Sequence, residues 1–140
     1  MLARLVASAV ALGAAAATSD CSSCVERGDS VVKVITHGVW SNTFWTLFRA
    51  AAVQAAADPG VALDMELRET WDSDVMAAEI DSLARTCLGK CVAVVTLPDA
   101  AARAAVARAT AAGVVVYGVN SGYPGAGLGL SGFVGANETE

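Results

Sequence analysis

The sequence has few basic residues and gathers none of them into a cluster. Nine Lys and Arg residues stand against fourteen Asp and Glu, so the formal net charge is −5 over 140 residues. Proteins that bind nucleic acids neutralise phosphates with a basic face. We therefore expect no nucleic-acid partner, and small neutral ligands or partner proteins remain.

The chain also lacks a hydrophobic run long enough to cross a membrane. A transmembrane helix needs roughly 20 apolar residues, and the run over residues 5–17 is shorter. This run follows Arg4 and precedes small residues, which is typical of a secretory signal peptide, although an N-terminal anchor or a buried helix is the alternative. We expect residues 1–19 to be a signal peptide and the protein to be exported, either to a periplasm or out of the cell.

Zinc and redox motifs are incomplete. Cys21 and Cys24 form a C-x-x-C in an expected linker over residues 20–30, but no second C-x-x-C and no His pair completes a zinc set. We expect neither a metal nor a cofactor. Four cysteines suit an exported protein, in which thiols persist as disulfides. Cys21, Cys24, Cys87 and Cys91 are all candidates, and the sequence leaves three pairings open.

The motifs of common enzyme classes are missing as well. No G-x-S-x-G elbow is present, although His37, Ser121 and an Asp could supply the residue types of a triad. Gly127, Gly129 and Gly132 have a spacing similar to a dinucleotide-binding loop, but they do not open a helix, and no P-loop lysine is present. We expect a protein without catalytic activity, and an α/β enzyme ranks last among the alternatives.

From residue 31 onward, strand and helix patterns alternate. Apolar strand patterns cover residues 31–37, 91–97 and 114–120, a strictly alternating strand typical of a sheet edge covers 61–68, and a short fifth strand covers 133–138. Helix patterns cover residues 42–58, 72–88 and 100–112. In the first helix, the apolar side chains at helical spacing are Phe44, Leu47, Phe48, Ala51, Ala52 and Ala55. This order predicts a single α/β domain, an open parallel sheet with helices on both faces.

Ligands of open α/β sheets bind beyond the carboxyl ends of the strands. The residues that follow the expected strands combine aromatic rings with short polar side chains: His37, Trp40, Asn42, Phe44, Trp45, Trp71, Asp72, Asp99, Asn120, Ser121, Tyr123 and Asn137. Aromatic rings can cover the C–H faces of a sugar while amides and carboxylates bind its hydroxyls. The pattern therefore predicts a site for a sugar or polyol.

A structural role is the alternative for several of these residues. Phe44 and Trp45 could be core residues in the first turn of a helix, and Asn42, Asp72 and Asp99 could be N-caps. For Asp72 and Asp99 we give capping at least equal weight with ligand contact.

Five short segments at the strand ends resemble one family. They are "THG" at 36–38, "SNTFW" at 41–45, "LPDAAA" at 97–102, "AAGVVVYGVNSG" at 111–122 and "FVGANE" at 133–138. Together they resemble the type 1 periplasmic binding proteins, in particular the simple-sugar or ribose-type binding proteins of ABC transporters. Each motif alone is weak, but the combination spans about residues 31–138.

The resemblance implies a two-lobed sugar clamp in which residues 31–140 form lobe one, with a flavodoxin-like strand order, truncated before the second lobe. It implies three partners, which are a sugar or polyol, an ABC transporter permease or membrane receptor, and the missing second lobe. By position, the implied ligand-binding residues are Trp40, Asn42, Phe44, Trp45, Asn120, Ser121 and Asn137, with His37 and Asp99 as further candidates. Thr43, Ser121 and Asn137 depart from the residues common in the family, which leaves the sugar open.

Two other functions share the fold. One is an exported receptor or interaction domain that no longer serves transport. The other is the effector domain of a transcription regulator, which would need a helix-turn-helix ahead of residue 31, where the signal-like segment stands.

Overall fold

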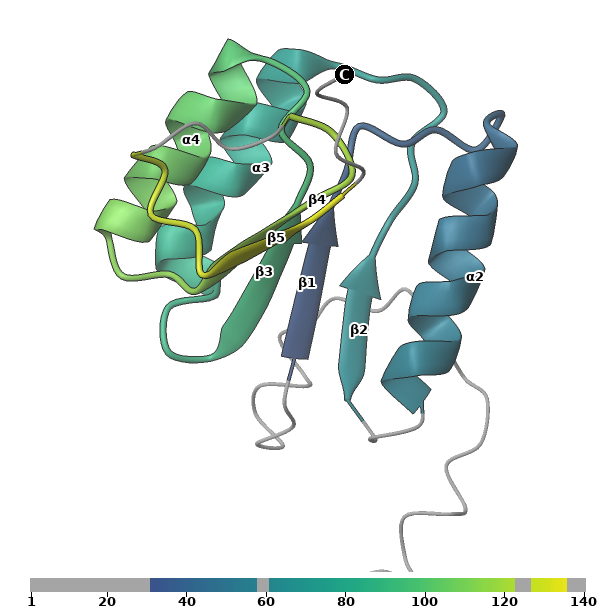
Figure 1. Ribbon diagram of the computed structural model, residues 1–140, viewed down its shortest axis with the longest axis horizontal. Coiled ribbons are helices and arrows are strands. Elements are labelled where there is room, and N and C mark those ends of the chain that lie inside the picture. The colour runs from purple at the N-terminus through teal and green to yellow at the C-terminus, as the bar shows by residue number, and fades with distance from the viewer. Residues whose placement is uncertain (1–30, 58–60, 123–126, 136–140) are drawn as a thin grey trace, which may run out of the picture.

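The computed structural model describes residues 31–57, 61–122 and 127–135, which form one five-stranded parallel sheet flanked by three helices (Figure 1). The elements follow the order β1 (Val31–Ile35), α2 (Thr43–Ala57), β2 (Ala62–Met65), α3 (Ser73–Thr86), β3 (Cys91–Val95), α4 (Ala100–Ala111), β4 (Val116–Val119) and β5 (Gly132–Val134). The expectations for the leader, for Cys21, Cys24 and Tyr123, and for Asn137 fall outside the described residues.

The strand order is β2-β1-β3-β4-β5, with every neighbouring pair parallel. The chain moves from β1 to one side and then returns past β1 to β3. Because such crossovers are right-handed, the helix of the first connection lies on the opposite face from the helices of the next two. Accordingly, α3 and α4 pack side by side on one face and α2 lies beside β2 on the other (Figure 1). The expected fold, including the edge position of β2, is confirmed.

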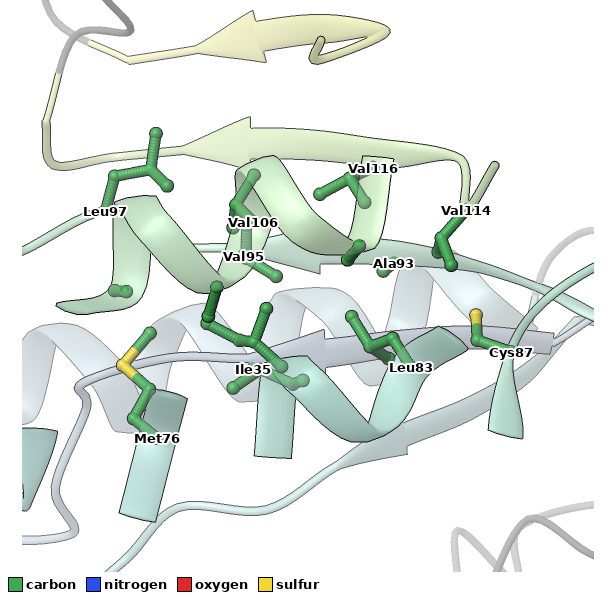
Figure 2. Packing of buried hydrophobic residues seen from close by; sticks show 14 residues of the cluster. Ile35, Met76, Leu83, Cys87, Ala93, Val95, Leu97, Val106, Val114 and Val116 are labelled. Atoms are coloured by element: carbon green, nitrogen blue, oxygen red, sulfur yellow. The ribbon is translucent and has the colours of Figure 1, made fainter. Parts of the chain in front are cut away.

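The main core lies between the sheet and the helix pair α3–α4 (Figure 2). Four side chains at helical spacing, three on α3 and one at its C-cap, are fully buried: Met76, Ile80, Leu83 and Cys87. They meet alternate residues of β3 and β4, such as Val95 and Val116. Because side chains alternate along a strand, these residues all lie on the face of the sheet that α3 and α4 cover.

A smaller core joins α2 to β1 and β2. Trp45, Val34, Met65 and Leu67 are buried there. The apolar stripe expected on this helix is wrong in part, because Phe44 is 50% exposed and Leu47 is 65% exposed. Arg49 and Gln54 are the only long polar side chains on α2. An almost uniformly apolar helix has no periodicity that marks its buried face.

On the α2 side of the sheet, the strands farthest from α2 carry exposed apolar residues. Val115, Tyr117 and Val134 are all exposed there. Tyr117 pairs with Gly132 in the parallel register of β4 and β5, and Val119 pairs with Val134. The helix therefore covers the β2 side of this face. No helix in the part of the chain that the structure describes is long and apolar enough to span a membrane.

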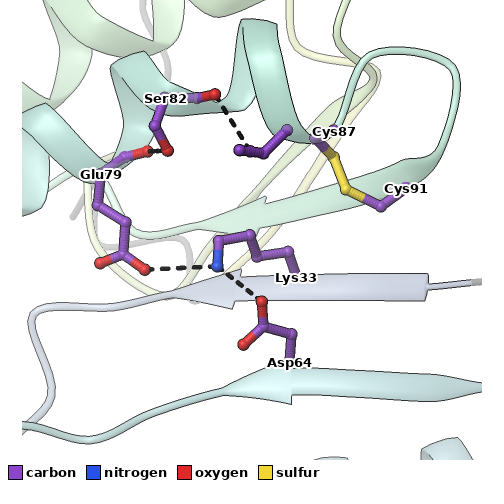
Figure 3. The surroundings of a disulfide bond; sticks show 7 residues. Lys33, Asp64, Glu79, Ser82, Cys87 and Cys91 are labelled. Carbon is purple, nitrogen blue, oxygen red and sulfur yellow. Dashed lines mark hydrogen bonds and ion pairs between the residues drawn. A yellow bond between two sulfur atoms is a disulfide. The ribbon is translucent and has the colours of Figure 1, made fainter. Parts of the chain in front are cut away.

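A disulfide joins Cys87 at the end of α3 to Cys91 at the start of β3 (Figure 3). It selects one of the three pairings that the sequence left open. Nearby, the Lys33 ammonium lies 2.7 Å from Oδ2 of Asp64 and 3.7 Å from Oε1 of Glu79, which links β1, β2 and α3. Both features lie away from the carboxyl ends of the strands and stabilise the scaffold.

Candidate functional site

The carboxyl ends of β1 and β3 meet at a turn that contains His37. Thr96, which follows β3, is fully buried, and its Oγ1 accepts a hydrogen bond of 3.1 Å from the backbone N–H of His37. The same oxygen lies 3.0 Å from Nδ1 of the imidazole. The Thr36 hydroxyl accepts a bond of 3.1 Å from the backbone N–H of Gly38. Two buried threonine hydroxyls therefore hold this turn from below.

Aromatic rings surround the imidazole of His37. The ring of Trp45 lies 4.9 Å away at an interplanar angle of 77°, and that of Trp71 lies 6.4 Å away at 74°. Phe44 in turn meets Trp45 edge to face at 4.9 Å. Such edge-to-face contacts are favourable for aromatic pairs. Trp45 is only 3% exposed, whereas Trp71 is 47% exposed. Trp45 thus supports the group from the core, and Trp71 and Phe44 present ring surface to the solvent.

Gly38 lets Trp45 pack this closely. A Cβ atom at position 38 would lie 2.5 Å from Cγ of Trp45, far inside van der Waals contact. A side chain here would push the indole out of the core and displace the neighbouring imidazole. The glycine of "THG" is therefore a packing requirement of the site.

Asp99 follows β3 and caps α4. Its Oδ1 accepts a bond of 2.8 Å from the backbone N–H of Ala102, and its Oδ2 accepts one of 2.6 Å from the Ser73 hydroxyl. The Ser73 hydrogen bond, followed by the backbone bond, holds the pKa of Asp99 below its usual value. The Ala101 backbone also donates to this carboxylate, which leaves one lone pair for a ligand hydroxyl.

The capping roles considered from the sequence are confirmed. Oδ1 of Asp72 accepts a bond of 2.9 Å from the backbone N–H of Val75, and Oδ1 of Asn42 accepts one of 2.9 Å from that of Phe44. Because α3 and α4 both begin at the carboxyl edge of the sheet, their caps stand beside the site. Asp99 therefore combines a capping role with an electrostatic effect on His37.

Burial lowers the pKa of His37, and this effect outweighs the opposing attraction of Asp99. The imidazole is therefore neutral at pH 7, while Asp99 is ionised. Within residues 31–57, 61–122 and 127–135, no three His, Cys, Asp or Glu side chains are grouped as metal ligands. The site offers aromatic surface, a neutral imidazole and a carboxylate, which together can bind hydroxyl groups.

The structure places the other predicted residues around this centre. Trp40 lies on the β2 side. Its ring packs under the Arg49 guanidinium at 5.4 Å, and its backbone N–H donates to the carbonyl of Arg68. Asn120 has a left-handed φ of 65°, and its N–H donates to the carbonyl of Val134.

Ser121 lies beside the end of β3, because its carbonyl accepts a hydrogen bond from the Leu97 N–H. Its Oγ is buried and has no hydrogen-bond partner among the described residues. Asn137 falls outside the described residues.

Sequence reasoning missed Thr96 and Ser73. Thr96 ends an apolar strand pattern, and Ser73 stands next to a capping aspartate, so each had a local explanation that concealed its contact. The only available signal was a hydroxyl residue at a strand end or helix start. Trp71 was expected among the residues that follow the strands, but it was not included among the predicted ligand-binding residues.

No family model and no curated protein matches the chain. It is similar to the crystal structure of a carbohydrate transporter from Acidothermus cellulolyticus 11B in complex with myo-inositol, with 31% sequence identity and a TM-score of 0.56. That match covers 66% of this chain and 31% of the transporter. The chain thus spans about a third of the protein it resembles.

A second similar structure is a 3-dehydroquinate dehydratase-like protein from Bifidobacterium longum. Its TM-score is 0.52 at 18% identity, and the match covers 78% of this chain and 85% of that one. At this identity the likeness shows the fold alone.

Proposed function

We propose that this chain is a non-catalytic solute-binding module that recognises a sugar or polyol for uptake or sensing. The observation that carries the proposal is the exposed ring of Trp71 beside His37 and Asp99 at the carboxyl ends of the strands. The similarity to a carbohydrate transporter bound to myo-inositol supports it. A ring-shaped polyol would stack a C–H face on Trp71 and bind the polar groups through its hydroxyls.

The proposal includes further protein. A good small-molecule site buries about 70–90% of its ligand, and one lobe contacts only one side of a sugar. Because the chain spans 31% of the similar transporter, we propose that a second lobe completes the site and that a permease or membrane receptor receives the loaded protein. This chain alone would then bind weakly.

We also propose that the protein works after export. The signal-like pattern over residues 5–17 supports this proposal, and so does the disulfide between Cys87 and Cys91, because such bonds persist in oxidising compartments.

The test is an NMR titration of the ¹⁵N-labelled chain with myo-inositol, ribose and a wider panel of sugars. We expect one of them to shift the indole N–H signal of Trp71 together with amides at His37 and Asp99. Trp71→Ala should remove the ligand-induced shifts at the amides of His37 and Asp99. The variant should remain folded, since an exposed ring contributes little to folding. Leu88→Ala, which removes an equally exposed side chain at the far end of the sheet, is the matched control.

If no ligand of the panel shifts these signals at its solubility limit, the binding proposal is wrong for this chain. An exported interaction domain of the same fold would then be the better description.

A further inference from the structure

We propose that Thr96 fixes His37 as the tautomer with its proton on Nε2, so that His37 and Asp99 act together as donor and acceptor for one ligand hydroxyl. The tautomer stands on the geometry of this chain alone. The ligand part of the inference rests on the function proposed above.

The hydrogen-bonding capacity of the Thr96 hydroxyl decides the tautomer. A hydroxyl has one hydrogen and two lone pairs. One lone pair of Oγ1 accepts the backbone N–H of His37, and among the described residues Nδ1 of His37 is the only other partner of this hydroxyl. Thr96 is fully buried, so its hydroxyl hydrogen does not face bulk solvent. The hydrogen therefore goes to Nδ1 at 3.0 Å, because otherwise it would remain unsatisfied inside the protein.

A ring nitrogen that accepts a hydrogen bond carries no proton. In a neutral imidazole the proton must then reside on Nε2. The edge contacts with Trp45 and Trp71 restrain the ring from turning over. Nε2–H has no hydrogen-bond partner among the described residues, which leaves it available as a donor.

Asp99 supplies the complementary acceptor. Two segments bring it to the same place as the imidazole. Thr96, which contacts the His37 ring, stands three residues before Asp99, and the loop that places Trp71 against the imidazole also places the Ser73 hydroxyl on the carboxylate. The bonds from Ser73, Ala102 and the Ala101 backbone hold the carboxylate of Asp99 in place and leave one lone pair for a ligand hydroxyl.

A hydroxyl group can accept from Nε2–H and donate to the carboxylate at the same time. A deoxy carbon can do neither, and a methyl ether or a ketone cannot donate. The pair therefore selects a hydroxyl at this position, and an analogue that lacks the hydroxyl would leave both protein groups unsatisfied.

The experiment uses the fact that His37 is the only histidine of the chain. In uniformly ¹⁵N-labelled protein without a histidine tag, both imidazole nitrogen signals belong to this residue. At a pH where the ring is neutral, we expect Nε2 to show the shift of a protonated nitrogen and Nδ1 that of an unprotonated one. A proton found on Nδ1 would overturn the proposal.

Three variants isolate the contact. Thr96→Val keeps the side-chain shape without the hydroxyl and should bring the two nitrogen shifts toward each other, as in a ring that exchanges tautomers. Thr96→Ser should restore the native pattern. Thr36→Val is the matched control, because it removes the threonine hydroxyl that accepts the Gly38 N–H of the same turn without touching the ring.

An unchanged tautomer in Thr96→Val would contradict the role of Thr96. If that variant does not fold, the wild-type tautomer and Thr96→Ser still decide the question.

The ligand part is tested with whichever polyol binds in the titration. Replacing in turn each of its hydroxyls by hydrogen or methoxy should identify one position at which both changes weaken binding. Thr96→Val should weaken binding of the parent polyol about twofold, because a ring that populates both tautomers about equally presents Nε2–H only half of the time, and it should leave binding of the analogue altered at that position unchanged. Equal losses for all analogues would overturn the selection of a hydroxyl, whereas absence of any binding would overturn the proposed function and leave the tautomer result standing.

Discussion

The Ser73 hydroxyl donates a hydrogen bond of 2.6 Å to Oδ2 of Asp99 and so ties the N-terminus of α3 to that of α4. This bond is the largest influence on the pKa of Asp99. Ser73→Ala should raise the pKa of Asp99 toward its ordinary value, because the carboxylate loses its strongest donor. An NMR titration of the side-chain carboxyl carbon measures the change.

Ser82→Ala is the control, because it removes a helix serine whose hydroxyl donates to the Glu79 carbonyl. A pKa of Asp99 that stays the same in Ser73→Ala would contradict this assignment.

His37 should make folding stability depend on pH near neutrality. Burial lowers its pKa in the folded state relative to about 6.5 in the unfolded chain. Between these two values the unfolded state binds the proton first, so the free energy of unfolding falls as the pH drops below about 6.5, until the folded pKa is passed. Urea unfolding at a series of pH values from 5 to 8 measures this fall.

His37→Gln should have a nearly level profile over that window, since it removes the only histidine. Parallel profiles for the two proteins would show that His37 titrates as an ordinary exposed histidine.

The disulfide prediction concerns all four cysteines. Peptide mapping under non-reducing conditions should recover Cys87 joined to Cys91, which leaves Cys21 and Cys24 to pair with each other. Replacing Cys87 and Cys91 by alanine together should lower the free energy of unfolding by about 2 kcal/mol, as expected for a short closed loop. A peptide that joins Cys87 to Cys21 or Cys24 would contradict the fold at this end of the sheet.

Gly38→Ala should destabilise the protein by about 1–3 kcal/mol, the usual cost of overpacking a core. Its Cβ would overlap the Trp45 ring at 2.5 Å. Gly118→Ala is the comparison, since its Cβ would meet the Phe133 ring at 2.7 Å, at the far side of the sheet. Both variants should lose stability in thermal melts, but only Gly38→Ala should shift the imidazole signals of His37. If both variants shifted the imidazole signals of His37 equally, the His37 turn would not depend on its local contact with the Trp45 indole.

Local patterns predicted the sheet and failed where a contact joins distant segments. Strict alternation over residues 61–68 placed β2 at the edge, and the polar residues before α3 and α4 predicted the caps Asp72 and Asp99. The bond from His37 to Thr96 joins residues 59 positions apart, and the sequence around neither residue predicts it. Such pairs depend on strand order, which becomes known only with the fold.

The aromatic residues show the same limit. Phe44 and Trp45 had the same predicted role, either as ligand contacts or as core residues, whereas the structure buries Trp45 and leaves Phe44 half exposed. The nearly uniform apolar surface of α2 gave no basis for choosing Trp45 over Phe44. The exposed Trp71, from a separate loop, completes the aromatic group only because β2 is adjacent to β1.

The two threonines that hold the His37–Gly38 turn act from the buried side of the sheet edge. The turn therefore keeps its shape without help from the exposed rings of Phe44 and Trp71. Mutations of Phe44 and Trp71 can therefore change the exposed aromatic surface while the strands beneath stay in register. If the proposed function holds, substitution of Phe44 or Trp71 should change ligand preference and leave the free energy of unfolding nearly unchanged.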